Sequence, residues 1–199
     1  MSKQSGMYYA PKGKAAPVVK PGEFTFAAVG LDHGHIYGMT NGLLEAGATL
    51  KWAWDPDPAK VERYRGAFPQ ARPASCERQV LEDAEVRLVA GACVTSERAD
   101  LGIRVMRAGK DYFTDKAPLT TLEQLAEVRK AVAETGRKYA VCYSERLQSE
   151  AAVYAGELVR SGAIGRVVQV LGLGPHRLDA ASRPAWFFQK EKYGGILCD

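Results

Sequence analysis

Residues 24–58 read FTFAAVGLDHGHIYGMTNGLLEAGATLKWAWDPDP, and this segment predicts the fold of the chain. The apolar run at 24–29, with aromatic and β-branched side chains, is typical of a strand. Apolar side chains at helical spacing follow it up to Gly47, namely Ile36, Met39, Leu43 and Leu44. Residues 50–54 form a second apolar run. The segment therefore predicts a strand, a helix and a second strand.

The same alternation continues along the rest of the chain. Further helices are expected at 58–68, 101–109, 122–135 and 150–160. Further strands are expected at 86–94, 111–114, 139–143 and 167–171. Glycine tolerates the left-handed backbone conformation that often ends a helix. Four of the expected helices end at a glycine, namely Gly47, Gly109, Gly136 and Gly162. This pattern indicates an α/β fold, a Rossmann-type doubly wound parallel sheet with helices on both faces.

The helix expected at 122–135 has the clearest signals. It begins with a capping box, in which the Thr120 side chain accepts a hydrogen bond from the N–H of Glu123 and the Glu123 side chain accepts one from the N–H of Thr120. Five apolar side chains are expected to form its buried face: Leu122, Leu125, Ala126, Val132 and Ala133.

The net charge of +4 on 199 residues is concentrated at the N-terminus. No acidic residue accompanies the four lysines before Pro21, which are Lys3, Lys12, Lys14 and Lys20. The other 23 basic residues balance 23 acidic ones, and a neutral body is a poor surface for nucleic acid. We expect residues 1–22, rich in lysine, glycine and proline, to form a flexible basic extension.

The composition is that of an ordinary globular protein, with 46% apolar and 25% charged residues. No run approaches the ~18 apolar residues of a membrane span, and the N-terminus lacks the apolar core of a signal peptide. We therefore expect a cytoplasmic protein with no membrane partner. No C-x-x-C spacing indicates a disulfide scaffold or a zinc site among the four cysteines, Cys76, Cys93, Cys142 and Cys198.

The turn after the first expected strand has the context of a dinucleotide-binding loop. Gly30 opens it, and the helix that follows can turn its N-terminus toward a pyrophosphate. The next two glycines of that motif are replaced by Asp32 and His35. Asp32 would bring a carboxylate near the phosphates, whereas His33 and His35 could donate hydrogen bonds to them. Gly34 could let the loop rearrange.

The alternative for this loop is an ordinary turn, in which Asp32 caps the helix and the histidines are solvated. His33 and His35 are not expected to bind a metal, because no third ligand is evident in the sequence.

Asp55 follows the second expected strand. In a dinucleotide fold, a carboxylate at this place can accept hydrogen bonds from both ribose hydroxyls of the adenosine half and repels a 2′-phosphate. Asp55 therefore favours NAD over NADP. The alternative is that residues 55–58 form only a turn and the N-cap of the next helix.

Across residues 24–199 the sequence resembles the Gfo/Idh/MocA family of nicotinamide-dependent oxidoreductases. The matching pieces, in the order and spacing of the family, are Val29-Gly30, Trp54-Asp55-Pro56-Asp57-Pro58, Ala108-Gly109-Lys110, Asp115-Lys116, Arg146, residues 161–167 and residues 194–199. The resemblance implies an NAD-binding Rossmann domain at 23–144 and the start of a C-terminal α/β substrate domain at 145–199. It also implies reversible hydride transfer between the nicotinamide and a sugar, a cyclitol or a related hydroxy or keto compound.

The resemblance further implies two catalytic residues. Lys116 matches the lysine of the family's Glu-Lys-Pro motif, here Asp-Lys-Ala, and would polarise the reacting oxygen and help to shuttle its proton. Asp199 matches the aspartate that works with this lysine. The alternative for Lys116 is a solvated lysine at a strand end, paired with Asp111 or Asp115.

Other residues match positions that surround the cofactor or the substrate in the family. The family's loop beside the nicotinamide has a proline, an asparagine and a histidine. The matching positions here are Val94, Thr95 and Arg98. Three residues are expected on the substrate side, with ordinary packing or surface exposure as the alternative for each: Arg146, His176 and Trp186.

The sequence stops at Asp199, inside a motif that in the family continues to a histidine. One strand and one helix cannot build the sheet of the second domain, because residues 167–171 would keep an unpaired edge. We therefore expect a fragment, inactive by itself, of an enzyme that acts as a homo-oligomer on a small carbohydrate-like substrate. The alternative is a nucleotide-binding or regulatory Rossmann protein without redox activity.

Overall fold

The computed structural model describes residues 16–144, 149–173, 178–196 and 198. The chain forms two compact units. Of the described residues, the sheet unit comprises those between 16 and 142 and between 184 and 198, and the second unit comprises those between 143 and 183. Among the described residues, no helix is both long and apolar enough to cross a membrane. The domain boundary expected after residue 144 stays a prediction.

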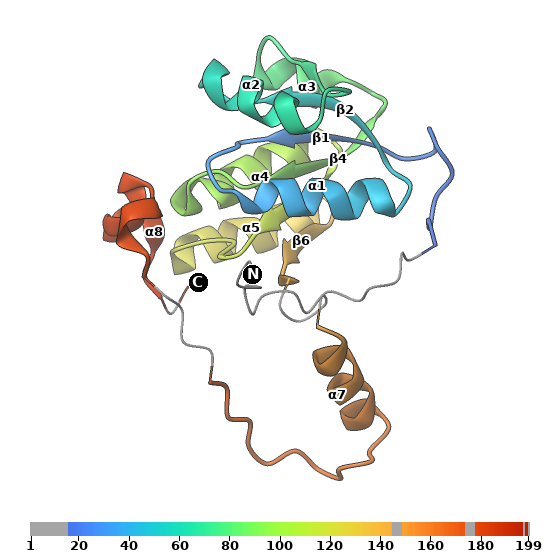
Figure 1. Ribbon diagram of the computed structural model, residues 1–199, viewed down its shortest axis with the longest axis vertical. Helices are drawn as coiled ribbons and strands as arrows, with labels where there is room; N and C mark the ends of the chain where they lie inside the picture. Colours follow the sequence, from blue (N-terminus) through green and yellow to red (C-terminus); the bar gives the residue numbers. More distant parts are fainter. Residues whose placement is uncertain (1–15, 145–148, 174–177, 197, 199) are drawn as a thin grey trace, which may run out of the picture. The chain divides into compact units, whose positions relative to one another are not determined.

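The sheet unit is built on six strands, and every neighbouring pair is parallel (Figure 1). The strands are β1 (Thr25–Val29), β2 (Thr49–Trp54), β3 (Arg72–Pro73), β4 (Val86–Gly91), β5 (Asp111–Asp115) and β6 (Tyr139–Cys142). Their spatial order is β3-β2-β1-β4-β5-β6, so the direction of winding reverses between β1 and β4. The predicted doubly wound parallel sheet is confirmed.

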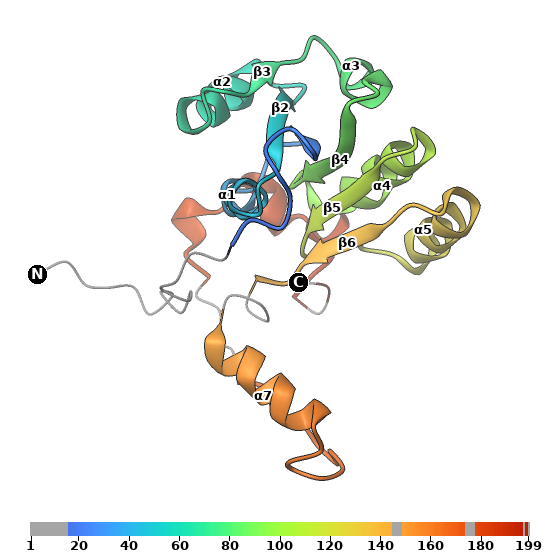
Figure 2. The same ribbon diagram turned by 90° about the vertical axis from the view of Figure 1, so that its right-hand side faces the viewer.

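Helices cover both faces of this sheet (Figure 2). Two helices pack on one face, α1 (His35–Glu45) and α2 (Pro58–Ala67). The other face carries α3 (Glu77–Glu82) and α4 (Arg98–Arg107), and α5 (Leu122–Thr135) packs beside α4. Successive side chains of a strand point to opposite faces, so β1 serves both cores. Phe26 and Ala28 enter one core, and Ala27 and Val29 enter the other.

Helix α5 has the predicted bounds but a different cap. The N-cap is Thr121, whose Oγ1 accepts a hydrogen bond from the N–H of Gln124 at 3.1 Å. The side-chain oxygen of Gln124 accepts one from the N–H of Thr120 at 2.8 Å. The capping box predicted for Thr120 and Glu123 is therefore wrong: the N-cap lies one residue later, and the returning bond comes from Gln124 and reaches the residue before the N-cap.

The buried face of α5 also differs from the prediction. Val128 and Ala131 are buried. Of the five residues predicted to be buried, Leu125 and Val132 are half-buried and three are exposed: Leu122, Ala126 and Ala133. Because α5 lies at the end of a layer and packs mainly on α4, it buries only a narrow stripe.

In the second unit, residues 167–171 do not form the predicted strand. They have no regular secondary structure, and Val168, Val170 and Leu171 are at least 78% exposed. A strand is held by hydrogen bonds to a neighbouring strand, and the described part of this unit contains none. Helix α7 (Glu150–Arg160) has the predicted bounds and is capped by Ser149, whose Oγ accepts from the N–H of Ala152 at 3.4 Å.

Several short elements were not predicted. Besides β3 and α3 they are the 3₁₀ turns η1 (Thr95–Glu97), η2 (Ala180–Ser182) and η3 (Ala185–Phe188) and the helix α8 (Lys190–Tyr193). Segments of this length contain too few apolar residues for a periodic pattern. In the sheet unit, α8 packs on η1, next to the end of β4.

The extension predicted to be flexible is partly ordered. Residues 1–15 lie outside the described residues, but the N–H groups of Val18 and Val19 donate to the carbonyl of Ala46 at 2.9 and 3.2 Å. The N–H of Gly22 donates to Oγ1 of Thr49 at 3.2 Å. The end of the extension is therefore held against the turn between α1 and β2.

Candidate functional site

Gly30 directly follows β1, where the winding of the sheet reverses. Its φ is +73°, and a Cβ at this position would lie 2.6 Å from Cβ of Cys93. Its N–H donates to the carbonyl of Trp54 at 3.0 Å, and its carbonyl accepts from the N–H of Ala92 at 2.9 Å. A side chain would be both strained and in collision, so the loop requires glycine here.

Asp32 forms an ion pair and does not cap the following helix. Its Oδ1 lies 2.6 Å from Nζ of Lys60, in the first turn of α2. The N-cap of α1 is Gly34, and no side chain caps this helix. The alternative that Asp32 caps α1 is therefore wrong. The ammonium group of Lys60 holds the carboxylate instead and offsets its negative charge in the loop.

His33 and His35 converge on one buried carboxylate. Nδ1 of His33 lies 3.0 Å from Oδ2 of Asp115, and Nδ1 of His35 lies 2.9 Å from Oδ1. The Asp115 side chain is 1% exposed, whereas those of His33 and His35 are 22% and 43% exposed. His35 keeps the solvent exposure that the alternative expects, but the two histidines are not free in solvent, because both rings bind the last residue of β5.

Asp115 is held in its ionised form. Burial alone would raise the pKa of Asp115, but the hydrogen bonds from His33 and His35 and the charge of Arg98 hold that pKa well below its usual range. A carboxylate anion only accepts hydrogen bonds, so each imidazole that binds Asp115 donates from Nδ1.

Arg98 supports this carboxylate from the interior of the protein. Its guanidinium is buried, and Nη2 lies 3.2 Å from Oδ2 of Asp115. The remaining donors bind carbonyls: Nε that of Cys93 at 2.8 Å, and Nη1 that of Ala117 at 3.1 Å and that of Lys116. The sequence marks Arg98 only as a departure from the family's loop and gives no sign of this contact.

The carboxylate of Asp55 anchors the loop after β1. Its Oδ2 accepts from the N–H of Leu31 at 2.7 Å, its Oδ1 accepts from the N–H of Asp57 at 2.9 Å, and the side chain has no exposed area. The predicted contacts of Asp55 to ribose hydroxyls stay a prediction. The turn and N-cap expected at 55–58 are confirmed, since Oδ1 of Asp57 accepts from the N–H of Ala59 at 2.9 Å.

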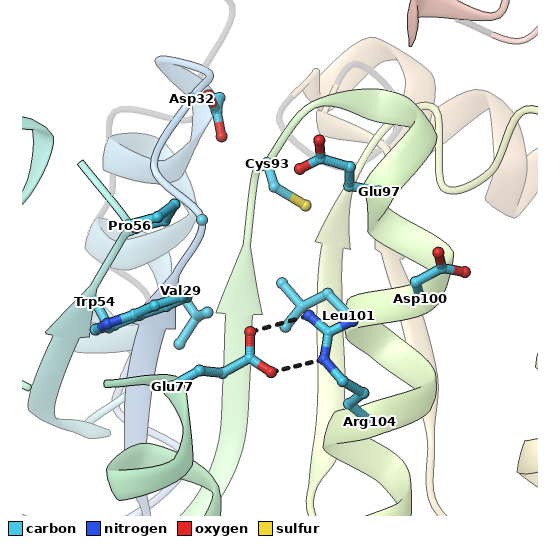
Figure 3. A pocket seen from close by; sticks show the side chains of 11 residues that line it. Val29, Asp32, Trp54, Pro56, Glu77, Cys93, Glu97, Asp100, Leu101 and Arg104 are labelled. Atoms are coloured by element: carbon cyan, nitrogen blue, oxygen red, sulfur yellow. Dashed lines mark hydrogen bonds and ion pairs between the residues drawn. The ribbon is translucent and has the colours of Figure 1, made fainter. Parts of the chain in front are cut away.

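A cavity of about 250 Å³ lies at the carboxyl ends of β1, β2 and β4 (Figure 3). Trp54 and Pro56 face Leu101 of α4 across it. Arg104 binds both carboxylate oxygens of Glu77 at one side, at 2.7 and 2.9 Å. Three further carboxylates line the cavity: Asp32, Glu97 and Asp100. An apolar slot with an acidic rim suits a planar group that carries N–H donors.

Lys116, Val94 and Thr95 lie at the same edge of the sheet. Lys116 directly follows β5, and its N–H donates to Oδ1 of Asp115 at 2.8 Å. Val94 precedes η1 and is half-buried, and Thr95 begins η1 and is buried. The catalytic role of Lys116 and the cofactor contacts of Val94 and Thr95 stay predictions.

Of the residues predicted on the substrate side, the structure describes Trp186. Its ring centroid lies 6.5 Å from that of His33, so η3 borders the loop after β1. The other predicted residues of this side, Arg146 and His176, lie outside the described residues, as does Asp199.

No family model matches the chain. D-xylose dehydrogenase of Paenarthrobacter nicotinovorans is 31% identical over 125 residues, which are 60% of this chain and 32% of that enzyme. A protein of Erwinia carotovora atroseptica SCRI1043, provisionally described as an oxidoreductase, has a crystal structure that matches 89% of this chain and 53% of its own, with 48% identity and a TM-score of 0.84.

Levoglucosan dehydrogenase, solved in complex with NADH and levoglucosan, matches 86% of this chain and 49% of its own at 20% identity and a TM-score of 0.70. The chain therefore spans about half the length of these solved structures and about a third of the D-xylose dehydrogenase. The strand order and these similarities show that the chain has the fold of Gfo/Idh/MocA-type NAD-binding oxidoreductases and corresponds to their N-terminal half.

Proposed function

We propose that the protein transfers a hydride between NAD and a sugar, a cyclitol or a related hydroxy or keto compound. The observation that carries this proposal is the cavity beside Gly30, at the reversal point where doubly wound sheets bind nucleotides. The similarity to a D-xylose dehydrogenase supports a carbohydrate-like substrate. The proposal applies to the whole enzyme, which we expect to be a homo-oligomer.

The cavity is proposed to take the adenosine half of NAD, between Trp54 and Leu101. The pyrophosphate would pass over Gly30 and the N-terminus of α1, where Gly34 leaves the backbone open to it. The carboxylates around the cavity repel a 2′-phosphate, which favours NAD over NADP.

When bound, NAD supplies the nicotinamide ring that accepts a hydride from the substrate carbon. The proposed role of Lys116 is to polarise the reacting oxygen, to hold its proton when the alcohol is oxidised and to return the proton when the ketone is reduced. Val94 and Thr95 are proposed to border the nicotinamide. Arg146, His176, Trp186 and Asp199 are the residues that we propose to orient the substrate.

Cofactor binding can be tested with tryptophan fluorescence. Trp54 lines the cavity, so saturating NAD should quench its emission by contact. Trp54→Phe should remove most of this quenching. Trp52→Phe is the matched control, because its indole N–H binds Asp83 at 2.6 Å and the ring lies outside the residues that line the cavity. Saturable quenching that survives Trp54→Phe would place the nucleotide elsewhere.

Catalysis can be tested with Lys116→Ala in a form of the protein that turns over substrate. Loss of a positioned proton carrier should lower kcat by ~10²–10⁴-fold and leave the Kd for NAD nearly unchanged. Lys130→Ala, an exposed lysine of α5, is the control and should leave kcat unchanged. An equal loss of turnover and NAD affinity would contradict the catalytic role.

One observation favours a second candidate, a nucleotide-binding or regulatory protein without redox activity. Asp32 and Lys60 occupy the loop with an ion pair where the dinucleotide motif has a glycine. Hydride transfer from NADH to any keto substrate by the whole protein would exclude this candidate.

A further inference from the structure

Three side chains outside the proposed adenosine cavity bring metal-ligating atoms to one point. One imidazole nitrogen each of His33 and His35 and a carboxylate oxygen of Asp115 all lie within 4.8 Å of one another. The two closest nitrogen–oxygen separations are 2.9 and 3.0 Å. The ligands of a tetrahedral ion with bonds of ~2.1 Å lie about 3.4 Å apart, so each of these pairs needs to separate by about half an ångström to surround an ion.

The donor set has a defined chemistry. Imidazole nitrogens suit Zn²⁺, Fe²⁺, Ni²⁺ and Cu²⁺, whereas Mg²⁺ and Ca²⁺ prefer oxygen ligands. Three protein ligands leave at least one coordination position open, and the 43% exposure of His35 gives solvent access to the site. We propose that His33, His35 and Asp115 bind a divalent transition-metal ion, of which Zn²⁺ is the first candidate. This site does not depend on the proposed redox function.

The surroundings hold the carboxylate in place for this role. Buried Arg98 donates to Oδ2 of Asp115 at 3.2 Å, and the N–H of Lys116 donates to Oδ1 at 2.8 Å. Outer hydrogen bonds of this kind orient the carboxylates of metal sites. Each carboxylate oxygen has two lone pairs, so Asp115 can keep these bonds while it binds an ion.

The metal-free and metal-bound forms differ in the position of two protons. Without an ion, each Nδ1–H donates to the anion of Asp115. With an ion, each Nδ1 gives its lone pair to the metal and the imidazole proton lies on Nε2. The ¹⁵N chemical shifts of the two imidazoles distinguish these forms directly.

The probe is Co²⁺, added to the untagged chain and followed by its visible absorption, with calorimetry of Zn²⁺ as a second measurement. We expect one equivalent to bind without the absorption of a cobalt–thiolate bond, because the cluster contains no cysteine. Loss of an outer-shell group costs up to ~100-fold in metal affinity. His35 is proposed as a direct ligand, so His35→Gln should weaken binding by at least ~100-fold. His176→Gln removes the remaining histidine of the chain and should leave the affinity unchanged.

Two results would overturn the proposal, provided that circular dichroism shows the wild-type fold. The first is the absence of saturable binding of both Co²⁺ and Zn²⁺ to the wild-type chain, with the ¹⁵N shifts remaining those of Nδ1–H donors. The second is equal binding by the wild type, His33→Gln and His35→Gln, which would put the ion elsewhere. Asp115→Asn also removes the ionic partner of buried Arg98, so the two histidine variants carry the test.

Discussion

A buried carboxylate ties the loop after β1 to the end of β2. Asp55 accepts from the N–H groups of Leu31 and Asp57, and an asparagine could accept only one of these bonds. We expect Asp55→Asn to lower the free energy of unfolding by about 1–3 kcal/mol, because a buried N–H loses its partner. Urea denaturation of the wild type and the variant measures this difference in the free energy of unfolding. Asp57→Asn is the control, with an expected change of a few tenths of a kcal/mol because asparagine caps a helix as well as aspartate does.

The stability of the protein should fall in acid partly through Asp83. Burial alone would raise the pKa of Asp83, but the hydrogen bonds from Lys51 and Trp52 lower it to about 2. This pKa lies below the value of ~3.9 in the unfolded chain, so ionised Asp83 stabilises the folded state. This stabilisation is complete above about pH 4 and is lost as the pH falls through 2. The full shift corresponds to ~2.6 kcal/mol, and solvent screening of this partly exposed group reduces the expected loss to about 2 kcal/mol.

This prediction is checked by chemical denaturation of the wild type and Asp83→Asn between pH 2 and 6. The wild type should lose more stability than the variant over this interval. Parallel curves would show that Asp83 titrates alike in the folded and unfolded chains.

At the scale of single residues, the sequence predicted where the candidate site lies but not its contacts. Gly30, Asp55 and Lys116 follow the ends of strands, and parallel strands bring those ends to one edge of a sheet. The contact of His33 and His35 with Asp115 depends on the packing of β1 beside β4 and of β4 beside β5, which no local pattern specifies. The same holds for Arg98, because arginine is a residue type that is mostly exposed and no local pattern indicates that this one is buried.

At the scale of elements, helix α5 offers a test of its observed cap. Thr121→Ala removes the oxygen that accepts from the N–H of Gln124 and should lower the free energy of unfolding by about 1 kcal/mol. Glu123→Ala, at the position that the sequence predicted for the capping box, should change it by a few tenths of a kcal/mol. Thermal unfolding of both variants ranks them, and a larger loss from Glu123→Ala would favour the predicted cap.

Elements with their own periodic apolar pattern were predicted to within a few residues. Helices α5 and α7 have the predicted bounds, and β4 begins at the predicted residue. The segment 167–171 has the composition of a strand but lacks a hydrogen-bonding neighbour among the described residues, so composition alone was misleading. Strand β3 has two residues and no pattern to detect.

At the scale of the whole molecule, the two halves of the sheet meet where Gly30 touches Cys93. Gly30→Ala should cost roughly 2–5 kcal/mol, from the strained φ and the collision together. Cys93→Gly removes the colliding Cβ, so the double variant should lose less stability than the sum of the single losses. Gly34→Ala is the control and should be nearly neutral, since its φ is −61° and its Cβ would meet no atom within 4 Å.

Denaturant unfolding of the four proteins of this cycle gives the coupling energy. Strict additivity of the two single losses would mean that the loop shifts away from Cys93 when a methyl group is added.

The alternation along β1 also restricts how the gene can change in length. Phe26 and Ala28 belong to one core, and Ala27 and Val29 belong to the other. Deleting one codon inside β1 would exchange these pairs and send the phenyl ring into space now filled by small side chains. Deleting two codons would shorten the strand but preserve the alternation. Insertions and deletions inherited within this strand should therefore come in even numbers, whereas the surface loops accept any number.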